Sequence, residues 1–253
     1  MRKIEDVLDF RGDISPFLTH LTRGTENKQA KEILEDIISS RQLLQSGNKT
    51  SSACYGCIDI HWDDTKKKSL FSSISFTETP LNEIHCLLEI ENRQIELEPY
   101  GLVFIKKNLM KKNISPVLYL NNYGENIDNL IHALGDIVTQ NDYPEELHKI
   151  FPLISSMGNM LTPRNGPSRA GTFDFSWERE WRRPYCYGSF EIDFENDIFI
   201  GLCPHDEITH FEEYAQRILG HQILFIDPQR NAKWYAKKLI ERRRKFGLTV
   251  SVV

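Results

Sequence analysis

The order of short apolar runs along this chain limits its fold more than any other feature. Strand-like runs at residues 70–77, 101–106 and 116–121 are mixed with helical patterns, and strand-like runs dominate the second half. A doubly wound parallel sheet requires a regular alternation of strand and helix, and this chain lacks it. The sequence therefore predicts an α+β fold, with a mixed, largely antiparallel twisted sheet as its core and helices on its flanks.

The length of the chain favours one domain of this kind. Its 253 residues, 40% of them hydrophobic, are enough to bury a sizeable core. Residues 155–171 contain three glycines and two prolines without any periodicity, which is typical of a loop. We expect a single α+β domain over residues 1–253, with a helical insertion at about 124–154 and a loop at about 155–171.

The sequence carries several indications of its cellular setting. The first ten residues are charged where a secretory segment would be apolar, and the number of cysteines, five, is odd. These features predict a cytoplasmic protein, and no run approaches the ~20 apolar residues that span a bilayer, so we expect no membrane partner. Cys54, Cys57 and His61 have metal-ligand spacing but lack a clear fourth ligand, so the prediction is no metal site.

One segment departs from the overall charge of the chain. The formal net charge is -5, which excludes attraction to nucleic acid by a global field. Residues 230–245 read as a basic helix, which is either a solvated helix face or a patch for phosphates, a partner or nucleic acid. Its basic residues, set against Glu241 alone, are Arg230, Lys233, Lys237, Lys238, Arg242, Arg243, Arg244 and Lys245.

The densest group of chemically useful residues is the segment at 177–182. In a strand, Glu178 and Glu180 would point to the same side, with Arg182 beside them. Two like charges on one face perturb each other, and such clusters are common where charge is stabilised or moved. The alternative is a surface strand held by Glu–Arg ion pairs.

Two earlier segments could bind a polar ligand. His20 and Thr22 would share one strand face and could hold a ribose by hydrogen bonds, although a buried histidine is the ordinary alternative. Ser75 and Thr77 would line one face of a second strand, with Phe76 on the other, and the alternative there is an edge strand with a solvated side. The order of the three segments is more informative than any one of them.

That order resembles a known group of proteins. The strings HLTRG, SFTETPL, EPYGLVFIKKNLM, PVLYLNN and EREWR are similar to the AbiGi-type abortive phage-resistance proteins, and to a bacterial family with a late W-x-x-E-x-E-W/Y-R motif. The resemblance covers about residues 17–226. It implies a role in bacterial anti-phage defence, in which some members act as antitoxins.

The same layout resembles the ADP-ribosyltransferase fold, whose members split nicotinamide from NAD. The resemblance implies that Glu180 is catalytic and that Glu178 activates or orients the acceptor. The central motif reads Ser-Phe-Thr rather than Ser-Thr-Ser, and Trp181 with Arg182 fits the phage-resistance pattern better than the classical toxins. The residues implied to bind NAD are His20, Thr22, Arg23, Ser75, Phe76, Thr77 and Arg182.

Two functions therefore follow from the resemblance. The first is an NAD-consuming ADP-ribosyltransferase or NAD glycohydrolase-like effector in abortive infection, with NAD as its substrate. The second is a non-catalytic antitoxin or regulatory protein that binds a toxin or antitoxin encoded nearby. The basic helix at 230–245 leaves nucleic acid open as a further partner.

Overall fold

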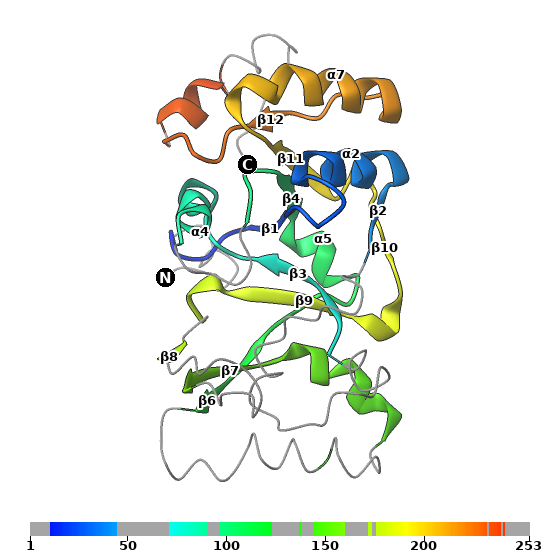
Figure 1. The fold of residues 1–253 in the computed structure, drawn as a ribbon, viewed down its shortest axis with the longest axis vertical. Coiled ribbons are helices and arrows are strands. Elements are labelled where there is room, and N and C mark those ends of the chain that lie inside the picture. The colour runs from blue at the N-terminus through cyan, green and yellow to red at the C-terminus, as the bar shows by residue number, and fades with distance from the viewer. Residues whose placement is uncertain are drawn as a thin grey trace, which may run out of the picture. The chain divides into compact units, whose positions relative to one another are not determined.

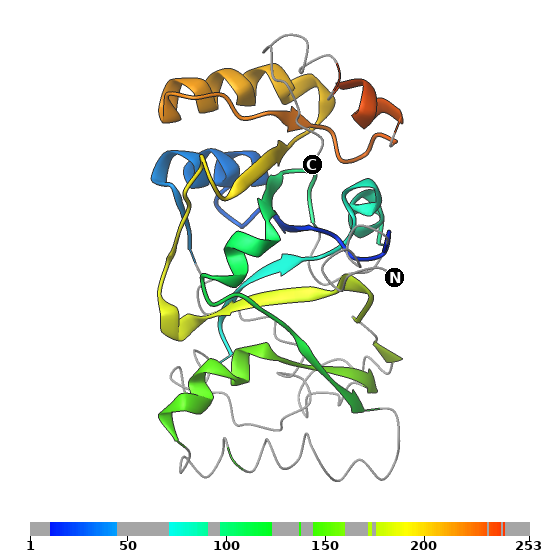
Figure 2. The ribbon, with the colours of Figure 1, turned by 180° about the vertical axis from the view of Figure 1, so that it is seen from behind.

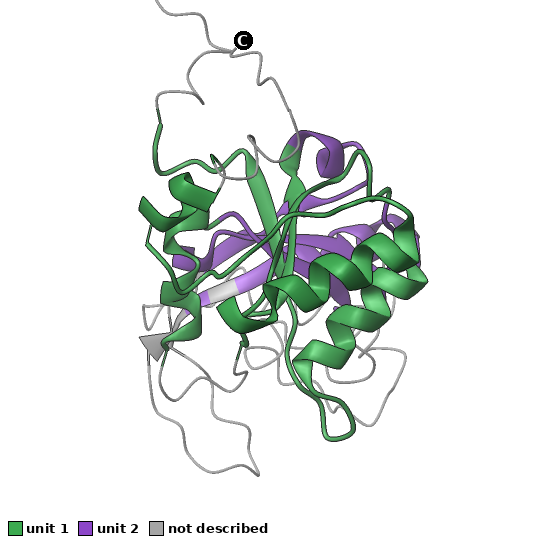
Figure 3. Ribbon diagram, turned by 90° about the horizontal axis from the view of Figure 1, so that it is seen from above, with its two compact units in different colours: residues 1–41, 79–106, 193–253 green, residues 42–78, 107–192 purple. Residues whose placement is uncertain are grey.

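The computed structural model describes residues 11–44, 71–90, 97–122, 137, 144–159, 172–173, 176–231, 233–238 and 240. The chain divides into two compact units (Figure 3). Unit 1 contains residues 1–41, 79–106 and 193–253, and unit 2 contains residues 42–78 and 107–192. Each unit combines helical segments with largely antiparallel strands, which confirms the predicted α+β class. The single domain stays a prediction.

Four of the described strands of unit 1 lie next to one another in the order β12-β11-β4-β1 (Figures 1 and 2). Strand β4 pairs antiparallel with both β1 and β11, whereas β11 and β12 are parallel. Two of these strands come from the first half of the chain and two from the last quarter, and the two pairs meet where β4 is hydrogen-bonded to β11. The bounds are β1 Phe17–Leu21, β4 Gly101–Ile105, β11 Ile198–Leu202 and β12 Phe225–Ile226.

The two longest helices of unit 1, α2 (Ala30–Ser40) and α7 (Ile208–Leu219), lie side by side in Figures 1 and 2. A turn at residues 25–28 precedes helix α2, and in it the Thr25 hydroxyl accepts the amide of Lys28. The helix begins after this turn, where the Glu32 carboxylate accepts the Gln29 amide at 2.8 Å. Shorter helices of this unit include η3 Leu81–Glu83, α4 His85–Leu88 and η8 His205–Glu207.

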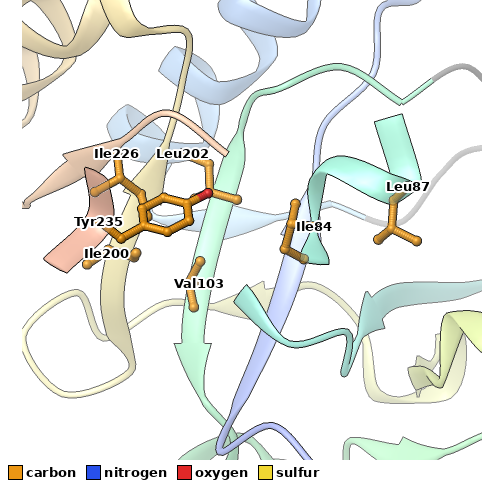
Figure 4. Packing of buried hydrophobic residues seen from close by; sticks show 7 residues of the cluster. All are labelled: Ile84, Leu87, Val103, Ile200, Leu202, Ile226 and Tyr235. Carbon is orange, nitrogen blue, oxygen red and sulfur yellow. The ribbon is translucent and has the colours of Figure 1, made fainter. Parts of the chain in front are cut away.

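A cluster of buried side chains fills one part of unit 1 (Figure 4). Strands β4, β11 and β12 contribute aliphatic residues, and the ring of Tyr235 packs against them. Only 6% of Tyr235 is exposed, yet its hydroxyl has no hydrogen-bond partner among the described residues. The members are Ile84, Leu87, Val103, Ile200, Leu202, Ile226 and Tyr235.

Replacing Tyr235 with phenylalanine is expected to leave the protein as stable as before or to stabilise it by about 1 kcal/mol, because it removes a buried hydroxyl that no hydrogen bond compensates. Urea unfolding of the two proteins measures the difference. Tyr100 is the matched control, since its hydroxyl donates to Glu207 at 3.1 Å and Tyr100→Phe should destabilise. A loss of stability in Tyr235→Phe as large as in Tyr100→Phe would contradict this assignment.

The described residues of unit 2 form three groups of paired strands. In the first, β9 (Glu180–Pro184) pairs antiparallel with β3 (Ser73–Thr77) and with β5 (Ser115–Pro116). The second pairs β2 (Gln42–Leu43) with β10 (Phe190–Glu191). The third has the order β6-β7-β8, with β6 and β7 parallel and β7 and β8 antiparallel; its strands are β6 Leu118–Asn122, β7 Ile154–Asn159 and β8 Thr172–Phe173.

Two segments of unit 2 differ from the expected pattern. The described end of the predicted helical insertion forms two short 3₁₀ helices, η4 (Glu145–Lys149) and η5 (Phe151–Leu153), and residues 123–136 and 138–143 lie outside the described residues. The predicted loop was wrong at its start, because residues 155–159 belong to β7, whose backbone pairs with β6. Residues 160–171 lie outside the described residues. The remaining short helices are α5 Lys106–Met110, η6 Ser176–Glu178 and η7 Tyr185–Tyr187.

Candidate functional site

The hydroxyl-bearing strand β3 and the acidic strand β9 are direct neighbours. Their antiparallel register places Thr77 opposite Glu180 and Ser75 opposite Arg182. Directly opposite residues lie on the same face of a sheet, with Cβ atoms about 5 Å apart. Four of the residues that the sequence singled out therefore share one polar face of unit 2.

Glu178 and Glu180 do not share a strand face, which corrects the expectation from their spacing. Residues Ser176–Glu178 form the 3₁₀ helix η6, and β9 begins only at Glu180. Between them Arg179 has φ 47°, in the left-handed region that costs a non-glycine residue about 1 kcal/mol. This turn redirects the chain, so the alternation of a strand does not apply to Glu178.

Hydrogen bonds from β3 hold the strained turn in place. The Thr77 hydroxyl donates to the carbonyl of Glu178 at 2.6 Å, and the amide of Glu78 donates to the carbonyl of Arg179 at 3.1 Å. Thr77, which was expected to bind the nucleotide, therefore uses its proton to fix the backbone beside the glutamates. Ser75 remains exposed on the same strand.

Arg182 and Glu180 form a two-point ion pair. Nε and Nη2 of Arg182 donate to the two carboxylate oxygens of Glu180 at 2.8 and 2.6 Å. The Arg182 side chain is only 3% exposed and that of Glu180 is 16% exposed. Such bidentate pairs are among the stronger hydrogen-bonded contacts, so the Glu180 carboxylate has a fixed orientation.

The same arginine also reaches the backbone of a neighbouring segment. Its Nη1 donates to the carbonyls of Pro152 and Ile154 at 2.9 and 3.1 Å. These contacts tie β9 to the end of η5 and the start of β7. Arg182, which the resemblance implies to bind NAD, therefore has Nε, Nη1 and Nη2 all engaged within unit 2.

Two residues of this site were missed from the sequence. The hydroxyl oxygen of Tyr119, on β6, accepts the amide proton of Glu180 at 3.0 Å, and burial is the main reason that its pKa is raised to about 12. The buried carboxylate of Glu78 accepts the indole N–H of Trp181 at 2.8 Å and lies 3.8 Å from the Arg179 guanidinium. Both residues lie in strings that the resemblance quoted, PVLYLNN and SFTETPL, but no spacing rule connected them to Glu180.

Phe76 points away from the polar face. It is 2% exposed and its ring packs edge-on against Phe190, with 6.3 Å between the ring centroids. Phe76 is therefore part of the core of unit 2, and its role in binding NAD stays a prediction. The alternation expected for β3 is confirmed, because Ile74 is buried with Phe76 whereas Ser75 is exposed.

The first predicted motif lies in unit 1. His20 is half-buried on β1 opposite Leu102 of β4, and Arg23 is half-buried just beyond the strand. Thr22 is buried, and its hydroxyl lies 3.2 Å from the carbonyls of both Ala30 and Tyr100, so it joins β1 to α2 and to the segment before β4. The binding of NAD by His20, Thr22 and Arg23, which the resemblance implies, stays a prediction.

A polar cavity of about 450 Å³ lies in unit 1 just after this motif. Gly24, Lys28, Lys31, Glu32, Glu98 and Tyr100 are among its lining residues. Its charged groups have internal partners: Lys31 pairs with Glu207 at 3.0 Å and Lys28 pairs with Asp36. The Tyr100 hydroxyl also donates to Glu207, and burial raises the pKa of this tyrosine.

The basic segment is described only in part. Residues 233–238 are helical, Arg230 pairs with Asp227 at 3.0 Å, and the Lys238 ammonium lies 5.8 Å from the Trp234 ring centroid. Residues 241–245, which include its three consecutive arginines, lie outside the described residues, as do Cys54, Cys57 and His61. Within the described ranges, no three metal-binding side chains gather into a possible metal site, and no helix is long and apolar enough to cross a membrane.

Comparison with known proteins found no matching family model, no matching curated protein and no matching solved structure.

Proposed function

We propose that this chain is an NAD-consuming ADP-ribosyltransferase or NAD glycohydrolase-like effector of bacterial anti-phage defence. The observation that carries the proposal is the register of β3 and β9, which sets Thr77 against Glu180 and Ser75 against Arg182. The resemblance requires a hydroxyl-bearing strand and a glutamate in one site. The sequence separates these two strands by about a hundred residues, so their pairing is not a consequence of local structure.

The reaction would proceed through charge stabilisation at the ribose. The bond between C1′ of the ribose and the nicotinamide nitrogen breaks, the nitrogen takes the electron pair, and neutral nicotinamide leaves. The ribose becomes oxocarbenium-like, as in glycoside hydrolysis, and a carboxylate fixed nearby stabilises its positive charge. Water or an acceptor nucleophile then forms the new bond to C1′ and releases its proton.

The proposal gives a distinct task to each charged residue of this site in unit 2. Glu180 would face the developing cation, and Arg182 would fix its orientation through both oxygens. Glu178, on the preceding turn, would take the proton of the attacking nucleophile. Within the same unit, Ser75, which is exposed on β3, would bind a polar group of the dinucleotide.

The central test of this proposal is release of nicotinamide from NAD. The purified protein should release it, and Glu180→Gln should lower the rate by at least about a hundredfold, because an amide cannot stabilise the cation as a carboxylate does. Glu191→Gln is the control, since Glu191 is exposed on β10 of the same unit. Activity must be compared below the melting temperature of each variant, because Glu180→Gln also removes the counter-charge of buried Arg182. Unchanged turnover in Glu180→Gln would refute the catalytic role.

A second function is favoured by the ion pair itself. Both oxygens of Glu180 already accept Arg182, as expected if the acidic strand is structural and the chain is a non-catalytic antitoxin or regulator. In that case the purified protein releases no nicotinamide and forms a stable complex with the product of a neighbouring gene. Size-exclusion chromatography of the co-expressed pair separates this outcome from the first.

A further inference from the structure

Tyr119 is a polar side chain at this site to which the motif layout gives no role. It lies on β6, which pairs in parallel with β7, and it is half-buried. Its hydroxyl oxygen is 3.0 Å from the backbone nitrogen of Glu180, which donates to it. The backbone carbonyl of Glu180 accepts the amide proton of Val117 at 2.9 Å. The segment 117–119 therefore contacts both the N–H and the carbonyl of Glu180, at the start of β9.

The hydrogen-bond capacity of this phenol is only half used. A tyrosine hydroxyl can accept and donate, and here the acceptor function is taken by the Glu180 amide. Among the residues that the structure describes, none accepts its proton. A tyrosine hydroxyl that is removed from bulk water usually finds a partner for its proton. The proton is thus available to an oxygen of a bound molecule.

The electrostatic surroundings indicate what such a molecule would be. The charges of Glu180 and Glu178 raise the pKa of Tyr119 and that of Arg182 lowers it, so all three groups lie within electrostatic reach of the hydroxyl. Burial raises the same pKa most, and the phenol therefore keeps its proton at neutral pH. A neutral donor beside two carboxylates suits an uncharged oxygen acceptor, such as a ribose hydroxyl or ring oxygen.

We infer that Tyr119 is a further substrate-binding residue of this site, whose hydroxyl donates to a ribose oxygen of NAD next to Glu180. The inference rests on the proposed function and adds to it a contact that the motif resemblance does not contain. It also gives β6 a task in unit 2, since this strand would carry one wall of the ribose site.

The test compares NAD affinity in matched tyrosine variants, by titration calorimetry at pH 6. Tyr119→Phe should weaken NAD binding about fivefold, the usual loss for one neutral hydrogen bond. Tyr185→Phe is the control, because Tyr185 is half-exposed in η7 of the same unit, and its affinity should equal that of the parent protein.

A second variant separates binding from structural damage. Tyr119→3-fluorotyrosine keeps the ring and the hydroxyl but makes the phenol a stronger donor and a weaker acceptor. If the proton contacts substrate, NAD binds more tightly in this variant; a phenol that only accepts the Glu180 amide gives no gain. Parent-like affinity in both Tyr119 variants, with nicotinamide still released, overturns the inference and leaves the proposed function standing. A parent protein that neither binds nor splits NAD overturns both.

Discussion

Arg182→Met is expected to lower the free energy of unfolding by about 3–5 kcal/mol, the largest effect of any side-chain change at the site. The substitution leaves the Glu180 carboxylate, 16% exposed, without the guanidinium that contacts both of its oxygens. It also removes the donor to the carbonyls of Pro152 and Ile154. Guanidinium chloride unfolding followed by circular dichroism measures the loss.

A double variant identifies the physical cause of that loss. If the cost comes from an unpaired carboxylate, Glu180→Leu combined with Arg182→Met should be more stable than Arg182→Met alone, because no charge is then left buried. Arg217→Met is the control, since Arg217 is exposed on α7 and should change stability by less than about 0.5 kcal/mol. A loss below about 1 kcal/mol in Arg182→Met would show that the ion pair does not hold unit 2 together.

Gly101→Ala is expected to destabilise unit 1 by about 3 kcal/mol or more, at the upper end of the range for overpacked cores. A Cβ atom at Gly101 would lie 2.3 Å from the carbonyl oxygen of His20 and 3.1 Å from Cα of Leu21. Both are backbone atoms of β1, which pairs with β4 at this point, so relief requires the two strands to separate. Thermal unfolding should show the variant melting well below the parent protein.

Gly12→Ala is the matched control for this substitution. A Cβ atom at Gly12 would meet nothing within 4 Å, so any effect there reflects the added methyl group alone. A comparison of the two variants distinguishes a loss of stability caused by close packing of β1 and β4 from a loss caused by replacing any glycine with alanine. Equal melting temperatures for Gly101→Ala and Gly12→Ala would contradict the close approach of β1 and β4.

The parts of the fold that can be predicted from the sequence are those determined by a local pattern of apolar and polar residues. The alternation of Ile74, Ser75 and Phe76 matches the two faces of β3, and the helical spacing of Leu34, Ile37 and Ile38 matches the buried face of α2. Both patterns depend on neighbours a few residues apart along the chain, which a single sequence contains.

What the sequence could not predict depends on backbone strain or on distant contacts. A left-handed turn at residue 179 separates Glu178 from Glu180. Glycine is the residue that usually indicates such a turn, but this position holds an arginine. The contact of Tyr119 with Glu180 joins residues 61 positions apart, and that of Trp181 with Glu78 joins residues 103 apart. Strand β7 lies in a glycine-containing stretch whose sequence is typical of a loop. Its strand conformation depends on parallel pairing with β6, which the local sequence does not show.

The two carbonyls that Arg182 contacts have a consequence for how this protein can change over evolution. Those acceptors belong to the main chain at Pro152 and Ile154, so they persist when the side chains there drift. All of the donors, by contrast, belong to the one side chain of Arg182, and lysine cannot reproduce the planar arrangement of its N–H groups. Substitutions at position 182 are therefore expected to be poorly tolerated, whereas the side chains of the segment 152–154 can change without loss of these hydrogen bonds.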